Sequence, residues 1–103
     1  MNPEYRGVIS AAHPGLVGHF PGNPVVPGVV ILDEVAQALA AWQPGLRSAG
    51  MPIVKFLAPL RPDQVFIIHL IEYSAGGIRF ECSRDDNGQL LAQGRIAVAC
   101  VDS

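Results

Sequence analysis

The sequence is short of charge and of cysteine, and each shortage excludes a class of protein. Only 16% of the 103 residues are charged, with seven Lys and Arg against nine Asp and Glu. No basic cluster is present, so nucleic acid is not an expected partner. Two cysteines without zinc-ligand spacing make neither a metal site nor a disulfide framework. We therefore expect no metal, and reduced core thiols at Cys82 and Cys100 in a cytoplasmic protein.

Long uncharged apolar runs are also missing. A membrane-spanning helix needs about 18 such residues in a row, and the first twenty residues show no basic start followed by an apolar core. We therefore expect neither a membrane span nor a signal peptide. Half of the residues are nevertheless hydrophobic. A domain of this size has too much surface to hide so many apolar side chains, so the excess predicts a large subunit interface.

The order of the predicted elements indicates one α+β domain over residues 1–103. A short strand over residues 5–11 precedes a loop whose prolines and glycines exclude regular structure. A helix is predicted over Gly28–Trp42, because Pro27 suits a helix start. The strand-forming stretches that follow are 53–58, 65–73, 77–83 and 89–101. Consecutive strands with short turns form an antiparallel sheet, and one helix packed on it gives this architecture.

The last two predicted strands alternate between apolar and polar residues, with Asn87–Gly88 as the turn between them. The residues expected to face the core are Ile78, Phe80, Cys82, Leu90, Ala92, Ile96, Val98 and Cys100.

Polar residues are few in the predicted helix. Asp33 and Gln37 are four residues apart and share a face, whereas Glu34 lies about 100° round the axis from Asp33. A helix that is apolar nearly all round is buried on most sides, where an unpaired carboxylate is costly. We therefore interpret Asp33 as the inward polar position, and Glu34 as the solvent-side residue.

The proline-rich loop places a histidine, His19, ahead of this helix. The first backbone N–H groups of the helix, at Gly28 and Val29, lack partners, and Gly28 has no side chain to block a ligand oxygen. A histidine base, an acid and an N–H aimed at an oxygen can remove a proton from carbon next to a carbonyl. His13 and His69 are expected to be surface or packing residues.

The stretch "GHFPGNPVVPGVVILDEVAQ", residues 18–37, is more specific than these arguments. It closely resembles the signature of the 3-hydroxyacyl-acyl-carrier-protein dehydratases, the FabA/FabZ family, and the short chain is similar to the ApeI-like group. The resemblance implies a hot-dog fold, in which an antiparallel sheet wraps around one long central helix. It also implies a hydro-lyase that forms trans-2-enoyl thioesters in fatty acid or related polyene or polyketide biosynthesis.

The same resemblance implies a role for each residue of the motif. His19 and Asp33 correspond to the catalytic pair, with His19 as base and Asp33 as the group that holds or protonates the leaving hydroxyl. Gly28 corresponds to the residue whose backbone N–H binds the thioester oxygen. The other implied substrate-binding residues are Phe20, Val29 and Gln37.

The resemblance further implies no cofactor and an assembly of more than one chain. In this family the histidine and the acid of one site come from two subunits, so a homodimer, or a higher oligomer of dimers, is expected. The implied partner is an acyl carrier protein that presents its substrate on phosphopantetheine. Arg47, Arg61 and Arg84 are candidates for docking it.

Two other functions stay open. A hot-dog acyl thioesterase would use an acid to activate water, although such enzymes usually lack the H-F-P-G loop. A non-catalytic acyl-thioester-binding subunit would keep the fold alone, although the intact His19 and Asp33 argue against it. An enoyl product would indicate the dehydratase, a free acid the thioesterase, and binding without turnover the non-catalytic subunit.

Overall fold

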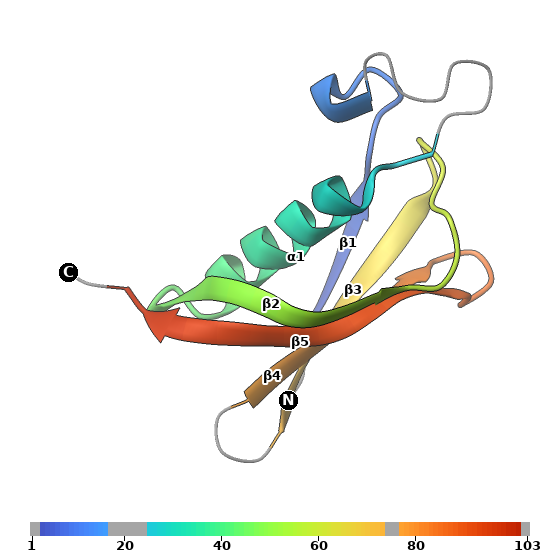
Figure 1. Ribbon diagram of the computed structural model, residues 1–103. Coiled ribbons are helices and arrows are strands. Elements are labelled where there is room, and N and C mark those ends of the chain that lie inside the picture. The colour runs from blue at the N-terminus through green and yellow to red at the C-terminus, as the bar shows by residue number, and fades with distance from the viewer. Residues whose placement is uncertain (1–2, 17–24, 74–76, 102–103) are drawn as a thin grey trace.

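The protein is one curved antiparallel sheet with a single long helix on one of its faces, as a computed structural model shows (Figure 1). The structure describes residues 3–16, 25–73 and 77–101. The elements in chain order are β1 (Glu4–Val8), a 3-10 turn (Pro14–Leu16), α1 (Gly28–Trp42), β2 (Leu46–Phe56), β3 (Val65–Tyr73), β4 (Gly77–Arg84) and β5 (Leu90–Cys100). The predicted α+β architecture is confirmed.

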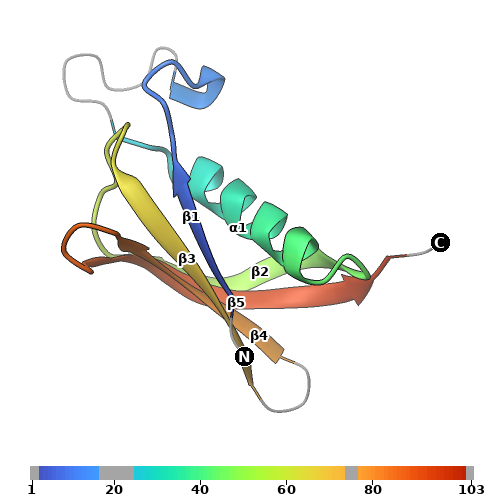
Figure 2. The same ribbon diagram turned by 180° about the vertical axis from the view of Figure 1, so that it is seen from behind.

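The sheet has the strand order β1-β3-β4-β5-β2, with all neighbours antiparallel. β3, β4 and β5 follow one another as hairpins, and β2 and β1 form the two edges. α1 connects these two edge strands along the chain and lies across one face of the sheet, as the view from behind also shows (Figure 2). No helix in the described part of the chain is long and apolar enough to cross a membrane.

The helix packs through one stripe of its surface. Ile31, Val35 and Leu39 recur every four residues, and each is at most 3% exposed. They pack into the same core as Phe66 and Phe80 of the sheet. This stripe follows the helical repeat, and the predicted bounds Gly28–Trp42 are confirmed.

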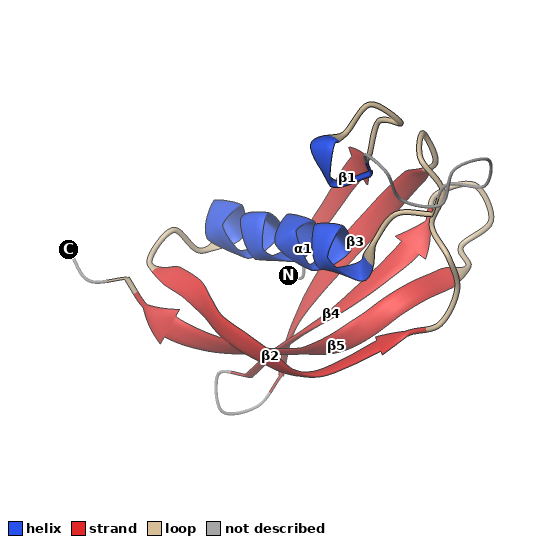
Figure 3. Ribbon diagram, turned by 45° about the horizontal axis from the view of Figure 1, so that its top comes forward, coloured by secondary structure: helices blue, strands red, loops and turns tan. Residues whose placement is uncertain are grey.

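The opposite stripe of α1 is open to solvent, which corrects the expectation that the helix is buried on most sides. Val29 is 74% exposed, and Asp33, Gln37 and Ala40 are exposed as well. The sheet covers the helix from one side only (Figure 3). The apolar residues Val29 and Ala40 on its other side are therefore not covered by the sheet of the same chain.

The largest difference from the sequence-based prediction is the length of β2. It begins at Leu46, not at residue 53, and its pairing with β5 shifts register on both sides of Gly50. Gly50 has a φ of +135°, which suits a bulge. Pro52 is tolerated because β2 is an edge strand. Glycine and proline hid this part of the strand because in isolation they indicate a loop.

Smaller differences concern the strand ends. β1 stops at Val8 instead of reaching residue 11, because a turn follows in which the Ala12 N–H donates to the Ser10 Oγ at 3.1 Å. In the described turn after β4, Gly88 has a positive φ of +72°, whereas Asn87 does not. Asn87 instead accepts the Gln89 N–H on its Oδ1 at 2.9 Å.

The alternation predicted for β5 is interrupted by a bulge. Cys82 pairs with Ala92, whereas the next residue of β4, Ser83, pairs with Leu90. The extra residue, Leu91, is fully buried beside Ala92. Cys100, expected in the core, is exposed at the strand end; Leu90 and Val98 are half-buried. The core positions predicted in β4 are confirmed, since Ile78, Phe80 and Cys82 are buried.

Thiol chemistry should separate the two cysteines. Burial raises the pKa of the Cys82 thiol from 9.0 to about 12, and the thiolate is the reactive form. In the native protein at pH 8 we expect iodoacetamide to modify Cys100 alone, as measured by intact mass. The Cys82 thiol stays protonated in the folded state while the unfolded chain ionises above about pH 9, so the free energy of unfolding should fall as the pH rises through that range.

The control for this labelling is Cys100→Ser, which should stay unmodified when native and take one label when unfolded. Equal labelling rates for both thiols in the native wild type would contradict the burial of Cys82.

Candidate active site

The site expected from the sequence lies around the start of α1, and part of it falls outside the described residues. His19 and Phe20 belong to the segment 17–24, which the structure does not describe. The described chain resumes at Val25 and enters the helix through Pro27, which has a φ of −60° and provides no side-chain cap. The N–H groups of Gly28 and Val29 therefore point out of the first turn without an i−4 carbonyl to accept them.

Hydrogen bonds from two parts of the chain hold this helix entry in place. The Val26 N–H donates to the Leu60 carbonyl at 2.8 Å, and the Leu57 N–H donates to the Leu91 carbonyl at 2.8 Å. The segment that follows β2 is thus tied to the helix entry on one side and to the β5 bulge on the other. The backbone around Gly28 is positioned by the sheet as well as by its own loop.

A cavity of about 460 Å³ opens at the helix start. Its walls come from the helix entry, including Val26, Gly28 and Ile31, and from the segment 56–60. Nearly all lining side chains are apolar, as is typical of pockets that bind the hydrocarbon part of a ligand. The predicted position of Gly28 beside a ligand space is consistent with this geometry.

The aromatic ring of Phe56 lies against the backbone of Gly28. A Cβ built on Gly28 would lie 2.5 Å from the Phe56 Cζ, closer than two carbon atoms can pack. An alanine at position 28 would therefore displace the ring of Phe56, a residue that is 53% exposed. The sequence did not predict that Phe56 and the residues after it line the cavity, because this segment was interpreted as the end of a strand. The apolar run that continues toward Leu60 is the feature of the sequence that could have indicated it.

Asp33 and Gln37 lie together on the exposed stripe of α1. The Gln37 Nε2 donates to the Asp33 Oδ2 at 2.8 Å, which confirms that they share a face. Both side chains are exposed, so the interpretation of Asp33 as an inward residue is wrong for the single chain. Helix phase explains the error: burying Ile31 and Val35 turns Asp33 away from the sheet.

Glu34 is also placed differently from the prediction. It is half-buried and lines a cavity of about 250 Å³ between α1 and β1, together with Tyr5, Arg6 and Phe66. The two neighbouring acids have thus exchanged their expected environments. Within one chain, Asp33 is not among the residues that line the cavity at Gly28.

The two histidines outside the motif, His13 and His69, are not among the residues that line the cavity at Gly28. His13 and His69 are both half-buried, and His69 occupies a position in β3 opposite Glu4 and Glu81. Among the described residues, no group of three or more His, Cys, Asp and Glu side chains could hold a metal ion.

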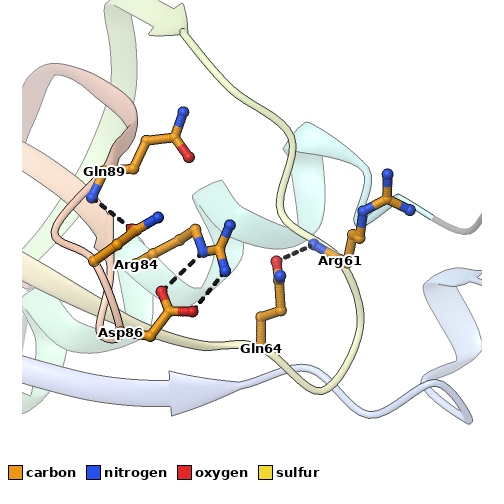
Figure 4. A network of polar contacts seen from close by, with 6 residues as sticks. Arg61, Gln64, Arg84, Asp86 and Gln89 are labelled. Atoms are coloured by element: carbon orange, nitrogen blue, oxygen red, sulfur yellow. Dashed lines mark hydrogen bonds and ion pairs between the residues drawn. The ribbon is translucent and has the colours of Figure 1, made fainter.

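The arginines suggested for carrier docking have varied surroundings. Arg84 donates to both oxygens of Asp86, from Nε at 3.0 Å and from Nη2 at 2.6 Å (Figure 4). Asp63, Asp85 and Asp86 line a hollow beside it. The Arg61 N–H donates to the Gln64 Oε1 at 2.9 Å (Figure 4). The surface around Arg84 is therefore acidic.

Comparison with known proteins agrees with the resemblance seen in the motif. The ApeI-like family model, described as ApeI dehydratase, matches residues 2–95. A curated relative is the 3-hydroxyacyl-[acyl-carrier-protein] dehydratase FabZ of Thermomicrobium roseum, 34% identical over 91% of this chain and 70% of the relative. FabZ of Ehrlichia chaffeensis is 31% identical over 81% of this chain and 64% of the relative. The chain thus spans about two thirds of the length of these relatives.

Among solved structures, the dehydratase heterocomplex ApeI:P from Xenorhabdus doucetiae contains a chain that superposes with a TM-score of 0.81. The two chains are 24% identical, and the match covers 97% of this chain and 88% of the other. This likeness confirms the predicted hot-dog fold. The family match over nearly the whole sequence shows that the chain belongs to the ApeI-like dehydratase family.

Proposed function

We propose that the protein dehydrates a 3-hydroxyacyl thioester, carried on acyl carrier protein, to the trans-2-enoyl thioester. The observation that carries the proposal is the apolar cavity at the helix start, where the Gly28 backbone meets Phe56. It gives a hydrocarbon chain a place beside the first backbone N–H of the helix, which has no partner within the helix itself. The match to a FabZ dehydratase and to the ApeI dehydratase family supports the same activity. Fatty acid or related polyene or polyketide biosynthesis in the cytoplasm stays the predicted setting.

The chemistry assigned to these residues is an elimination of water. His19 removes the proton from the carbon next to the thioester carbonyl, and the electrons move onto the carbonyl oxygen. The Gly28 N–H, at the positive end of the helix dipole, stabilises this oxyanion. One such donor is worth about 10²–10³ in rate. As the electrons return, the double bond forms and the C–O bond at the 3-position breaks.

Asp33 is assigned to the leaving hydroxyl: it holds this group while the proton that His19 removed is passed to the hydroxyl oxygen, so that the group departs as water. Its Oδ2 accepts the hydrogen bond from Gln37, which fixes the direction of the carboxyl group. The other oxygen is then directed at the hydroxyl. A well-placed acid or base of this kind contributes roughly 10²–10⁴ in rate.

A complete site requires two chains in this proposal. Asp33 lies on the exposed stripe of α1 and does not line the cavity of its own chain. If two copies pack through this stripe, the Asp33 of one copy faces the Gly28 cavity of the other. Val29, 74% exposed on the same stripe, is then covered by the second copy.

The edge of the sheet supports a homodimer independently. β2 is an edge strand of 11 residues, and Ile53 and Phe56 on it are 46% and 53% exposed. The bulge at Gly50 and Pro52 protect the first half of this edge, whereas the half that carries Ile53 and Phe56 is regular and is the part that could pair with another chain. Pairing between two copies of β2 would cover this edge and bring both helices to the same side.

Removal of either reactive group should abolish dehydration. We expect His19→Ala and Asp33→Asn each to lower kcat by about 10²–10⁴, measured as loss of one water by mass from a panel of 3-hydroxyacyl carrier thioesters. Glu34→Gln is the matched control, since this neighbouring acid faces β1 and should keep activity. Full activity of His19→Ala would exclude the mechanism. Free acid as product would indicate a thioesterase, and binding without turnover a non-catalytic subunit.

Gly28→Ala tests the contact between the helix start and Phe56. The added methyl group would collide with the ring, so we expect it to displace the Gly28 N–H and to lower kcat by about 10²-fold, the value of one oxyanion donor. Gly28→Ala combined with Phe56→Leu should recover part of the loss, because the smaller side chain makes room. Gly45→Ala, where a Cβ meets nothing within 4 Å, should retain full activity. Unchanged kinetics for Gly28→Ala would refute this role.

Val29→Arg tests the helix stripe as the dimer interface. Burying an unpaired arginine is costly, so we expect a monomer by light scattering and loss of activity. Val8→Arg is the control, because Val8 is 53% exposed on β1, at the far edge of the sheet. Retained dimers in Val29→Arg would place the interface elsewhere. A wild-type monomer that becomes active only with a second protein would indicate a heterocomplex instead of a homodimer.

Mixing the two inactive variants tests whether the site is shared. Exchange of subunits between His19→Ala and Asp33→Asn forms mixed dimers with one intact pair, so activity should reappear on mixing. Each variant alone, treated in the same way, is the control. Failure to recover activity, with exchange confirmed by native mass spectrometry, would show that both groups act within one chain.

A further inference from the structure

The outer face of the sheet, which is the face turned away from α1, is apolar along β3. Phe66 and Leu70 of this strand are buried on the helix side, so the residues that alternate with them point outward. These include Ile67 and Ile71, both half-buried, and Val65, which is 42% exposed. In the described part of the chain, α1 lies on the opposite side and all strands belong to this one sheet (Figure 2). No second layer of the same chain therefore covers the outer face.

This pattern differs from that of a sheet with one face in water. Antiparallel strands of that kind usually alternate between apolar and polar residues, whereas strands covered on both faces are apolar throughout. β4 and β5 do alternate, and their polar residues lie on the outer face. β3 therefore indicates that the outer face is covered by another molecule along part of its width, and the charges on either side indicate which molecule this is.

One end of the outer face is positive. Arg79 of β4 lies directly opposite Arg95 of β5, and like charges in this position destabilise a sheet. Lys55 of β2 lies in the next row, opposite Gln93. These three cations surround a hollow of about 320 Å³. Glu81 also lines it, with its Oε1 4.0 Å from the Arg79 Nη2, so three cations face one carboxylate.

The other end of the outer face is negative. Asp85 follows directly after β4 and is six residues beyond Arg79, which places it on the same face about 20 Å away at the usual rise per residue. Its N–H donates to the Val65 carbonyl at 3.0 Å. Asp85 lines a hollow of about 280 Å³ together with Asp63 and Asp86. Two of these three carboxylates are each paired with one arginine, so the group keeps a net negative charge.

We propose that the outer face packs against the outer face of a second copy of this chain, through a two-fold axis perpendicular to the strands. Such an axis reverses the strand direction, so the positive end of each copy lies over the negative end of the other. β3 spans Val65–Tyr73 and crosses its counterpart near its middle, where Ile67 of one copy meets Ile71 of the other. The contact is self-complementary, as an interface between identical surfaces requires.

This contact uses a different surface from the proposed homodimer, and the two can coexist. Pairing through β2 brings both helices to one side of a continuous sheet, and both outer faces to the other side. Two dimers then stack sheet to sheet and make the contact twice, which closes a tetramer. The tetramer rests on the proposed homodimer, whereas the contact itself does not. It also does not depend on the dehydration chemistry.

The area of the outer face is sufficient for a stable contact. Five strands spaced about 4.8 Å apart give a face of up to roughly 600 Å². A tetramer buries four such faces, which exceeds the roughly 1,000 Å² that a specific interface needs. One contact between two single chains lacks the second, linked contact and is much weaker. For this reason Val29→Arg is still expected to be a monomer.

Reversing the charges at one end of the face at a time tests the contact. The first double variant is Arg79→Glu with Arg95→Glu, and the second is Asp85→Lys with Asp86→Lys. Asp63 stays unchanged, because its φ of +67° disfavours a longer side chain. Like charges meet in each double variant, so we expect its mass by light scattering to be half that of the wild type. An equimolar mixture of the two restores opposite charges at both ends, and the wild-type mass should return.

Arg47→Glu is the control, because Arg47 is exposed at the start of β2 and lines neither hollow. It should keep the wild-type mass. The contact is overturned if the double variants and the wild type have equal masses, if Arg47→Glu loses as much mass, or if the mixture stays separated. None of these masses depends on turnover. Absence of dehydration therefore counts against the proposed function alone, and Val29→Arg tests the homodimer separately.

Discussion

The packing of α1 against the sheet is the contact on which the rest of the molecule depends. Val35 and Leu39 of α1 are completely buried between the helix and the sheet, and Ile31 continues the same stripe toward the helix start. Because a helix has only one phase relative to its sheet, this burial decides where every other residue of α1 points. It places Gly28 at the mouth of an apolar cavity, and it turns Asp33 and Gln37 outward.

This outward position changes how the two candidate catalytic groups relate. An acid on the solvent-facing side of a helix serves a cavity at that helix start only if another chain brings the two together. The exposed stripe from Val29 to Gln37 and the open edge of β2 lie where a second copy would cover both. The proposed homodimer would account for the surplus of apolar residues, for the exposed apolar side chains on the edge of β2 and for the separation of Asp33 from the cavity.

The two faces of β2 show how the fold keeps different tasks apart. Phe56 faces the cavity and limits the space above Gly28, while Lys55 lies beside Arg79 and Arg95 on the face of the sheet away from α1. Alternation along a strand makes this separation possible within two residues. The bulges around Gly50 adjust the register of β2 with β5, and that register places Ile53 beside Arg95.

The sequence alone determined the helix bounds, the strands β3 and β4, the family and the identity of the candidate catalytic residues, because these depend on local pattern and on one contiguous motif. Tertiary structure decided what depends on contacts between distant segments. The Gly-Pro-interrupted half of β2 becomes a strand only because β5 offers hydrogen-bond partners to an edge that tolerates bulges. Cys100 is exposed and Leu91 buried because a bulge shifts the alternation of β5. Asp33 and Glu34 exchanged their expected environments because neither residue sets the phase of the helix; the buried contacts of Ile31, Val35 and Leu39 with the sheet do.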